Sequence, residues 1–535
     1  MHKERYEKWL EKATEYREEL EGIAGNEAEI EDRFHQDLEF GTAGLRGKMG
    51  GGTNRINLYT IRKATAGLAE FIVSEGDYAK ERGVAIAFDS RNNSDILAME
   101  CAKVLAGYGI NAYIYEELRS TPQLSFTVRH LSTIAGIMIT ASHNPKEYNG
   151  YKCYWEDGGQ MPPKVSDVLL RTISEIDEFD VRIQNSGFRI QDFIHTIGED
   201  IDNAYLDAVW VKSIRKGGDL AITYTPLHGA GLTPVWETLK QNGFRNINLV
   251  LEQIEPNGDF PTAPYPNPEK EECWALAIEA ASTAQSDIII ATDPDSDRVG
   301  VMARNSRGQM KKLNGNQVGI LLTEYVLSNV TLPPDPAVVS TIVSSRVTKK
   351  ICEAHGVAYF DVYTGFKNIA EKILEFEEKN SHNFVMGWEE SIGYLVGDYC
   401  RDKDAIVAAM LICQMAQDQK DRGKTLWDYL DEIYAKYGAR IEETIDLTKE
   451  GLDGAKEINA IMEGYRTNPP TNIGGIKIDS IIDYKKATAP ANVISLQLES
   501  GSEICVRPSG TEPKIKFYFS AINAEELKTL KEGMF

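Results

Sequence analysis

The sequence predicts a protein of the α/β class, with three α/β units in series and a smaller α+β domain at the C-terminal end. Three observations support this prediction. A chain of 535 residues is too long for one hydrophobic core, and at roughly 100–200 residues a domain it should form three to five domains. Apolar, β-branched runs alternate with segments of helical periodicity along most of the chain. The final segment alternates differently and ends in a short helix.

The same patterns place the domains. The strand-like runs at 84–88 and 134–139 lie on either side of the helical pattern at 96–105, which indicates a mainly parallel sheet. This rhythm restarts near 220 and again near 337. The predicted segments are a helical extension at 1–40, α/β domains at 41–203, 204–312 and 313–438, and an α+β domain at 439–535.

The first 40 residues predict one amphipathic helix that packs across a domain. They are rich in Glu and Lys, and they carry apolar side chains at helical spacing. These side chains are Tyr6, Trp9, Leu10, Ala13 and Tyr16.

Charge and hydropathy exclude several classes of partner. The chain has 58 Lys and Arg against 81 Asp and Glu, a formal net charge of −23, whereas nucleic acids and anionic lipids require clustered cations. No apolar run approaches the roughly 18–20 residues of a membrane span, and residues 1–5 are charged, unlike a signal peptide. The seven cysteines lack metal-binding spacing, which favours reduced, mostly buried thiols. We therefore expect a cytoplasmic protein that binds neither nucleic acid nor membrane.

Ser142 follows the predicted buried strand at 134–139, in the segment TASHNP. Ligands of open α/β sheets bind beyond the carboxyl ends of the strands, so a hydroxyl at this place can reach a substrate. His143 and Lys152 offer groups for proton transfer and for pairing with phosphate. The alternative is a loop in which Ser, Asn and Pro only build a turn.

Asp293, Asp295 and Asp297 follow a second apolar strand. Alternate residues of an extended chain share one face, so the three carboxylates are expected to converge on one hard cation such as Mg²⁺. A calcium-binding EF-hand is excluded, because its loop needs Gly and Glu where this chain has Arg298 and Arg304. A solvated acidic turn is the alternative.

Two further loops offer groups that bind sugars and phosphates. Residues 387–393 hold Glu389, Glu390 and Ser391 between glycines, and such groups hydrogen-bond to sugar hydroxyls. An acidic pair in a loop is also often simply solvated. Residues 507–514 combine Arg, two hydroxyls and a glycine, which can wrap around a phosphate; a plain turn is the alternative. Together the four segments predict phosphoryl transfer on a sugar, because that reaction uses all four kinds of group.

These motifs occur in the order known from the α-D-phosphohexomutases, and the chain resembles that family, especially its phosphoglucomutase and phosphomannomutase members. The resemblance runs from Gly41 to Lys514 and implies a heart-shaped enzyme of four domains, each contributing one loop to a central cleft. It implies that Ser142 is a phosphoserine, and that one Mg²⁺ per subunit is held by Ser142 and the three aspartates.

The resemblance also assigns the remaining site residues. Residues 41–47 look like the N-terminal active-site loop of the family, and 364–367 look like its third-domain loop. Arg46 joins Ser142, His143 and Lys152 as a catalytic candidate. The implied substrate-binding residues are Arg298, Thr364, Gly365, Lys367, Glu389, Ser391, Arg401, Arg507, Ser509, Gly510, Thr511 and Lys514. Tyr399 stands where some relatives have a histidine, which leaves the general acid or base unassigned.

The loop at 389–391 resembles the glucose-type variant of the family, and this resemblance implies a phosphoglucomutase that interconverts glucose 1-phosphate and glucose 6-phosphate through glucose 1,6-bisphosphate. The alternatives are a phosphomannomutase, a phosphopentomutase or a glucose 1,6-bisphosphate synthase, since a few loop contacts decide which sugar is preferred. A different class, a haloacid-dehalogenase-type phosphatase, would use Asp293 as its nucleophile. Asp297 argues against that class, which wants Thr or Val there. We expect sugar phosphates as the partners and either a monomer or a homodimer.

Overall fold

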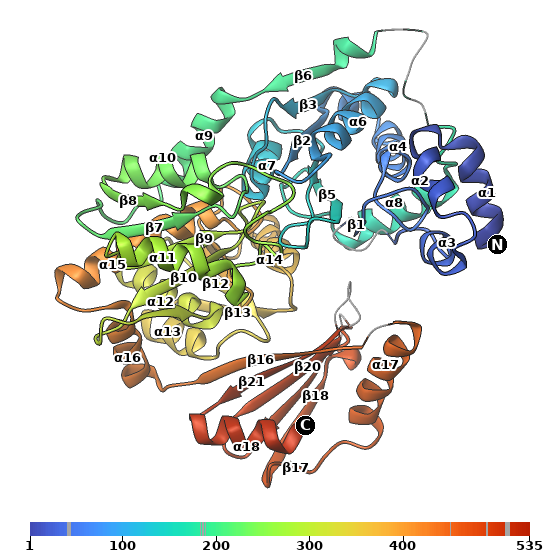
Figure 1. Ribbon diagram of the computed structural model, residues 1–535. Helices are drawn as coiled ribbons and strands as arrows, with labels where there is room; N and C mark the ends of the chain where they lie inside the picture. The colour runs from blue at the N-terminus through green and yellow to red at the C-terminus, as the bar shows by residue number, and fades with distance from the viewer. Residues whose placement is uncertain are drawn as a thin grey trace.

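The computed structural model contains four β-sheets that follow one another along the chain (Figure 1). It describes residues 1–39, 44–181, 183, 187, 189–449, 451–487, 490–508 and 514–535. The first three sheets are flanked by helices and contain parallel strands, whereas the fourth is antiparallel. The predicted sequence of three α/β units and a final α+β unit is confirmed. The domain boundaries drawn from the sequence stay predictions.

The N-terminal extension is helical, but the prediction of a single helix was wrong. Its helices are α1 (His2–Lys12), α2 (Arg17–Gly22) and α3 (Glu27–Phe34). The chain leaves helical geometry at Ala13, where ψ is 75°, and at Gly25, where φ is 82°. Asn26 then starts a new helix, because its side chain accepts a hydrogen bond from the Glu29 N–H.

The first sheet has the strand order β1-β5-β4-β2-β3-β6. Its strands are β1 (Leu45–Lys48), β2 (Val84–Phe88), β3 (Ala112–Tyr115), β4 (Ala135–Ile139), β5 (Tyr148–Trp155) and β6 (Ile194–Ile197). The neighbouring pairs β4–β2, β2–β3 and β3–β6 are parallel. Strand β5 pairs antiparallel with both β4 and β1. The accompanying helices are α4 (Leu58–Ser74), α5 (Asp77–Arg82), α6 (Ser94–Gly107), α7 (Thr121–His130) and α8 (Pro163–Glu175).

Alternate residues of β2 explain why this strand is apolar throughout. Ile86 packs in a core with residues of α4 and α6, whereas Ala85 and Ala87 pack in a second core with residues of α7. Helices therefore cover both faces of the sheet, as expected for parallel strands.

The second sheet has the order β11-β10-β9-β7-β8, and helix α9 (Glu199–Trp210) precedes it. Its strands and helices are β7 (Ala221–Thr225), α10 (Leu232–Asn242), β8 (Asn246–Leu249), α11 (Ala275–Thr283), β9 (Ile288–Thr292), β10 (Val299–Arg304) and β11 (Met310–Leu313). The loop between β9 and β10 carries the three aspartates.

The third sheet has the order β13-β12-β14-β15. Its strands are β12 (Pro336–Thr341), β13 (Ala358–Val362), β14 (Asn383–Glu389) and β15 (Gly393–Val396). Its helices are α12 (Gly315–Asn329), α13 (Val347–His355), α14 (Phe366–Lys379), α15 (Ala405–Asp421) and α16 (Leu426–Tyr437). Helix α15 is apolar nearly all round and is buried between the second and third units, which share one continuous core.

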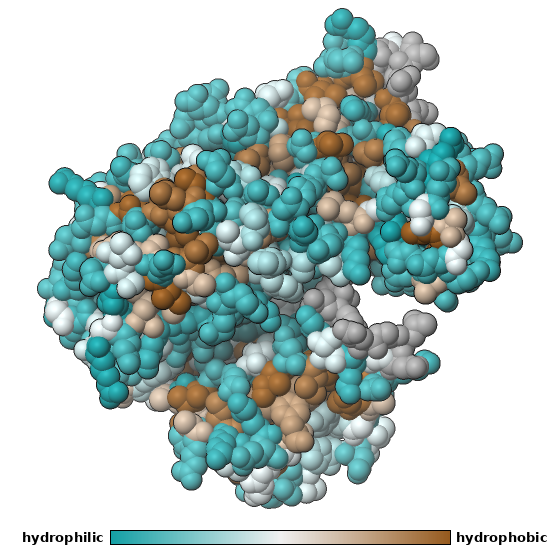
Figure 2. All heavy atoms as spheres, viewed as in Figure 1, coloured by the Kyte–Doolittle hydropathy of each residue, from teal (hydrophilic) through white to brown (hydrophobic). Residues whose placement is uncertain are grey.

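The fourth sheet has the order β16-β21-β20-β19-β18-β17 and its own core. Its strands are β16 (Ile441–Thr448), β17 (Asn472–Ile473), β18 (Ile476–Asp483), β19 (Ile494–Leu498), β20 (Glu503–Pro508) and β21 (Lys514–Ala521), with helices α17 (Gly451–Thr467) and α18 (Ala524–Met534). Short 3₁₀ turns occur at Thr14–Tyr16, Ile190–Phe193, Leu251–Gln253, Glu271–Trp274 and Tyr484–Lys486. The molecular surface is indented between the first unit and this sheet (Figure 2).

Trp9 anchors the N-terminal helices to the first α/β unit. Its side chain is 1% exposed and meets the rings of Phe34, Tyr59 and Phe179 edge-on, at centroid distances of 6.0, 5.3 and 5.6 Å. We expect Trp9→Ala to cost about 3–5 kcal/mol of local stability. Limited proteolysis should then cut within α1 to α3 faster than in the wild type. Equal cutting of Trp9→Ala and of Tyr78→Ala, whose residue is 75% exposed, would contradict this anchoring role.

Candidate active site

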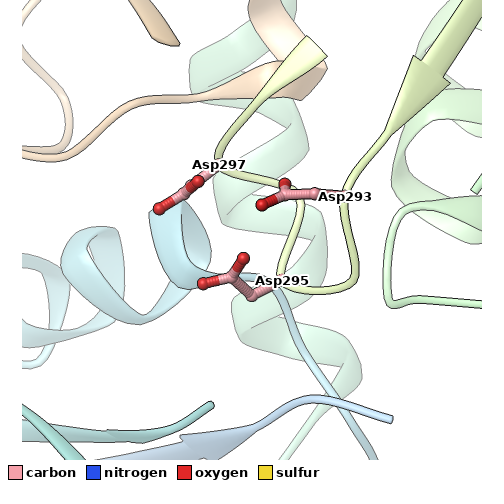
Figure 3. A group of neighbouring side chains, drawn as sticks. All are labelled: Asp293, Asp295 and Asp297. Carbon is pink, nitrogen blue, oxygen red and sulfur yellow. The ribbon is translucent and has the colours of Figure 1, made fainter. Parts of the chain in front are cut away.

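Asp293, Asp295 and Asp297 converge in the loop between β9 and β10 (Figure 3). One oxygen from each carboxylate lies within 4.8 Å of the others, and all three residues are buried. Their convergence was predicted, but its cause was not, because the segment is a turn and not an extended strand. Ser296 has a φ of 53°, and its N–H donates to the Asp293 carbonyl at 2.9 Å.

The buried carboxylates fit a hard cation. Asp295 Oδ1 and Asp297 Oδ1 have no hydrogen-bond partner among the described residues. Burial, reinforced by repulsion from Asp295 and Asp297, raises the pKa of Asp293 well above its ordinary value. A cation bound to the three groups would satisfy these oxygens and lower that pKa, and carboxylate oxygens are the ligands that Mg²⁺ prefers.

Ser142 lies against this acidic group although it belongs to the first α/β unit. It lies in the loop that follows β4 and has a φ of 53°. Its Oγ donates to Asp293 Oδ2 at 2.9 Å and lies 3.0 Å from His143 Nδ1. The fold therefore brings together two motifs that lie 151 residues apart in the chain.

Two buried lysines balance the charge of the aspartates. Lys152, on β5, places its Nζ 2.7 Å from Asp295 Oδ2 and 3.4 Å from Asp297 Oδ2. Lys403 places its Nζ 3.1 Å from Asp297 Oδ2 and 3.0 Å from Asp402 Oδ1. Burial opposes the ionisation of Asp297, but Lys403, Lys152 and Arg298 outweigh it and lower the pKa of this carboxyl.

Lys403 was missed by the sequence reasoning, and Arg401 was chosen in its place. The side chain of Arg401 is fully buried, its Nη2 is paired with Glu377 on α14, and its Nη1 donates to the Asp398 carbonyl. A guanidinium held in this way would have to break its ion pair before it could bind a substrate, and the substrate-binding role of Arg401 stays a prediction. The available signal was the run of four charged residues at 401–404 directly before the apolar helix α15.

Two more of the predicted cations, Arg298 and Arg46, lie near the loop that carries Ser142. Arg298 has its Nε 3.7 Å from Asp297 Oδ1 and its Nη1 3.6 Å from Glu269 Oε2. Arg46, on β1, donates from Nη1 to Asn144 Oδ1 at 3.5 Å. Burial lowers the pKa of His143 well below its ordinary value, and the positive charges of Arg298 and Arg46 add to this effect. His143 is therefore neutral near pH 7.

The loop at 389–392, which belongs to the third unit, contacts the loop that carries the three aspartates. The N–H of Val299 donates to the Ile392 carbonyl at 3.0 Å, which joins the two loops through their backbones. Glu389 is buried at the end of β14, and its charge contributes to raising the pKa of Arg298. Glu390 accepts a hydrogen bond from Thr341 Oγ1 at 3.1 Å. Ser391 is partly buried in the turn between β14 and β15.

A lysine beside the third-domain loop lies close enough to an arginine of the fourth sheet to feel its charge. Thr364 and Gly365 precede α14, and Gly365 has a φ of 106°. Burial lowers the pKa of Lys367, and the nearby charge of Arg507, on β20, lowers it further. Lys514 begins β21. The predicted residues Ser509, Gly510 and Thr511 lie outside the described residues.

Domain models of one protein family match all four units of the chain. Four models of phosphoglucomutase/phosphomannomutase domains match in order: α/β/α domain I at 37–180, domain II at 201–308, domain III at 314–437 and the C-terminal domain at 456–535. A phosphoglucomutase of Staphylococcus aureus (strain USA300) is 37% identical over 537 residues, spanning 96% of this chain and 95% of the relative. The chain belongs to the phosphoglucomutase/phosphomannomutase family.

Solved structures agree with the fold of this family. A phosphoglucomutase from Paramecium (parafusin, open form) has a TM-score of 0.69 at 18% identity and covers 92% of this chain and 93% of its own. A phosphoglucomutase/phosphomannomutase family protein from Burkholderia thailandensis has a TM-score of 0.68 at 17% identity, covering 92% and 95%. The protein is thus a phosphohexomutase, an isomerase, and the dehalogenase-type alternative is not favoured. Within the part of the chain that the structure describes, none of the helices has the length and apolarity to cross a bilayer.

Glu390 should make the stability of the enzyme depend on pH. Burial, together with the charge of Glu389, raises the pKa of Glu390 from 4.5 to about 7. The folded protein holds this proton more tightly than the unfolded chain, so the stabilisation is complete below pH 4.5 and is lost as the pH rises through about 7. Between these values the Tm of the wild type should fall more steeply than that of Glu390→Gln, measured by calorimetry. Parallel Tm profiles would show that Glu390 has no raised pKa.

Proposed function

We propose that this phosphohexomutase is a phosphoglucomutase that interconverts glucose 1-phosphate and glucose 6-phosphate. The observation that carries the proposal is the hydrogen bond of 2.9 Å from Ser142 Oγ to Asp293, within a buried group of three aspartates. The S. aureus relatives named phosphoglucomutase, such as the strain RF122 protein at 38% identity over 540 residues, support the choice of glucose.

Ser142 is the proposed carrier of the phosphoryl group. As phosphoserine it transfers the group to a free hydroxyl of the sugar monophosphate. The P–O bond to Ser142 breaks as the bond to the sugar oxygen forms, and the proton of the sugar hydroxyl passes to the Ser142 oxygen. The product is glucose 1,6-bisphosphate, which turns over and returns its other phosphoryl group to the Ser142 hydroxyl. In this return step the P–O bond to the sugar oxygen breaks, and the proton released from the Ser142 hydroxyl ends on that sugar oxygen. Neutral His143, 3.0 Å from Ser142 Oγ, can relay the proton.

Mg²⁺, one per subunit, is the proposed cofactor. Asp293, Asp295 and Asp297 would hold it together with an oxygen of phosphorylated Ser142. The bound ion would supply positive charge that stabilises the phosphoryl group during transfer. The support for this assignment is that Asp295 Oδ1 and Asp297 Oδ1 are buried and have no hydrogen-bond partner among the described residues.

The remaining loops would bind the substrate. Lys152, Arg298 and Arg46 lie on the side of Ser142 and would pair with the reacting phosphate. Glu389 and Ser391 would bind sugar hydroxyls. The other phosphate would be held at the fourth sheet and the third-domain loop. The residues proposed there are Thr364, Gly365, Lys367, Arg507, Ser509, Gly510, Thr511 and Lys514.

Preference for mannose or pentose phosphates, and net synthesis of the bisphosphate, are the competing functions within this family. They use the same carrier and differ in the contacts to the sugar. We further propose that the protein is a monomer or a homodimer. We also propose that it works in the cytoplasm, and the seven buried free cysteines support this location because reduced thiols are typical of that compartment.

Ser142→Ala tests the proposed carrier. We expect kcat for glucose 1-phosphate to fall by roughly 10⁴-fold or more, because the nucleophile is lost. The affinity for glucose 6-phosphate, measured by calorimetry, should change little. Ser166→Ala is the matched control, since this buried serine lies on α8 away from the site. Retained turnover in Ser142→Ala would refute the carrier role.

The same assay on a panel of substrates tests the sugar. Wild-type enzyme should show its highest kcat/KM with glucose 1-phosphate among glucose, mannose and ribose 1-phosphates. A clear preference for ribose 1-phosphate or mannose 1-phosphate would overturn the glucose assignment while leaving the role of Ser142 intact.

A further inference from the structure

Arg91, which follows β2, makes an unusual set of hydrogen bonds. The residue is 3% exposed, and its guanidinium donates to four backbone carbonyls of the loop that carries Ser142. Nη2 donates to the carbonyls of Ser142 and Asn144 at 2.5 and 2.6 Å. Nη1 donates to those of Pro145 and Tyr148 at 2.9 and 3.1 Å. One side chain thus holds the loop from residue 142 to residue 148.

Asp89 completes this arrangement from the other side of Ser142. Its Oδ2 accepts a hydrogen bond from Thr140 Oγ1 at 2.6 Å, and Thr140 Oγ1 in turn accepts one from the Ser142 N–H at 2.7 Å. Asp89 Oδ2 also lies 3.3 Å from Arg91 Nε, and both side chains are fully buried. The N–H and the carbonyl of Ser142 are therefore both held by one buried ion pair.

Ser142 needs such support because its backbone is strained. Its φ of 53° lies in the left-handed region, which is unfavourable for a residue with a Cβ. Strained residues persist where the surrounding structure over-determines them. In this conformation the Ser142 hydroxyl points to Asp293. Without the hydrogen bonds from Arg91 and Thr140, the backbone of Ser142 would relax and the hydroxyl would turn away from Asp293.

Residues of the second unit pack against Arg91 and Asn92. The guanidinium lies over the ring of Phe260, 5.1 Å from its centroid. Asn92 Nδ2 donates to Asp259 Oδ1 at 3.3 Å, and a Cβ on Gly258 would come within 2.3 Å of the Asn92 nitrogen. Residues 258–260 therefore pack directly on the segment that holds the Ser142 loop.

We propose that Arg91 is a positioning residue that holds Ser142 in the conformation required for phosphoryl transfer. This inference rests on the proposed role of Ser142 as the phosphoryl carrier. The planar guanidinium is essential to it, because a lysine ammonium keeps the charge beside Asp89 but cannot reach four carbonyls that are spread over seven residues. Arg91 acts through the backbone and does not touch the substrate.

The test compares Arg91→Lys with the wild type. The rate of Ser142 phosphorylation by glucose 1,6-bisphosphate is measured by rapid quench, together with kcat and KM for glucose 1-phosphate. We expect the phosphorylation rate and kcat to fall by about 10- to 100-fold, because small misplacements of a reacting group have effects of this size. KM should stay nearly unchanged. The matched control is Arg55→Lys, since Arg55 is 5% exposed and pairs with Asp32 in the N-terminal region.

Each outcome decides a separate point. Equal phosphorylation rates in Arg91→Lys and Arg55→Lys would overturn the positioning role. A wild-type enzyme that is not phosphorylated on Ser142 would instead refute the proposed function. If Arg91→Lys does not fold, Phe260→Leu serves as the second variant, with an expected loss of about 3- to 10-fold in the phosphorylation rate from weakening the cation–π contact. An unchanged rate in a folded Phe260→Leu would contradict the proposal.

Discussion

The buried carboxylate of Asp297 is the constraint on which the site depends. Its two closest cations are Lys152 from the first α/β unit and Lys403 from the third, at 3.4 and 3.1 Å, whereas Asp297 itself belongs to the second. Removing one partner of a buried ion pair costs about 3–5 kcal/mol, because the other charge stays buried without compensation. The ion pairs of Asp297 with Lys152 and Lys403 therefore hold the first three units together at this carboxylate.

This balance explains how residues from separate units act together. The Thr121 hydroxyl donates to Asp295 at 2.8 Å, and Ser142 donates to Asp293 at 2.9 Å, so the start of α7 and the loop after β4 both contact the aspartates. The N–H of Ala405 donates to the Ser296 carbonyl at 3.2 Å, which joins the same turn to the third unit. The fourth sheet has a core of its own, and Arg507 lies near the end of its inner strand β20. The three aspartates therefore lie where the first three units meet.

Local patterns predicted the strands, the helices that cover them and the group of three aspartates, because burial and spacing are visible in a single segment. They failed where the answer depends on distant partners. Lys403 and Arg401 are both cations of one short segment, but Lys403 pairs with Asp297 and Arg401 pairs with Glu377. The clamp of Arg91 on the Ser142 loop spans 51 residues and leaves no periodic signal. The break after Ala13 is likewise a single backbone angle within a helical pattern.

The most direct test of the account is the chemical nature of the phosphoenzyme. The enzyme is incubated with ³²P-labelled glucose 1,6-bisphosphate, with and without Mg²⁺, and the label is mapped by peptide analysis and hydroxylamine treatment. The account predicts a Mg²⁺-dependent, hydroxylamine-resistant label on the peptide that contains Ser142. A hydroxylamine-labile acyl phosphate on the peptide that contains Asp293 would contradict it.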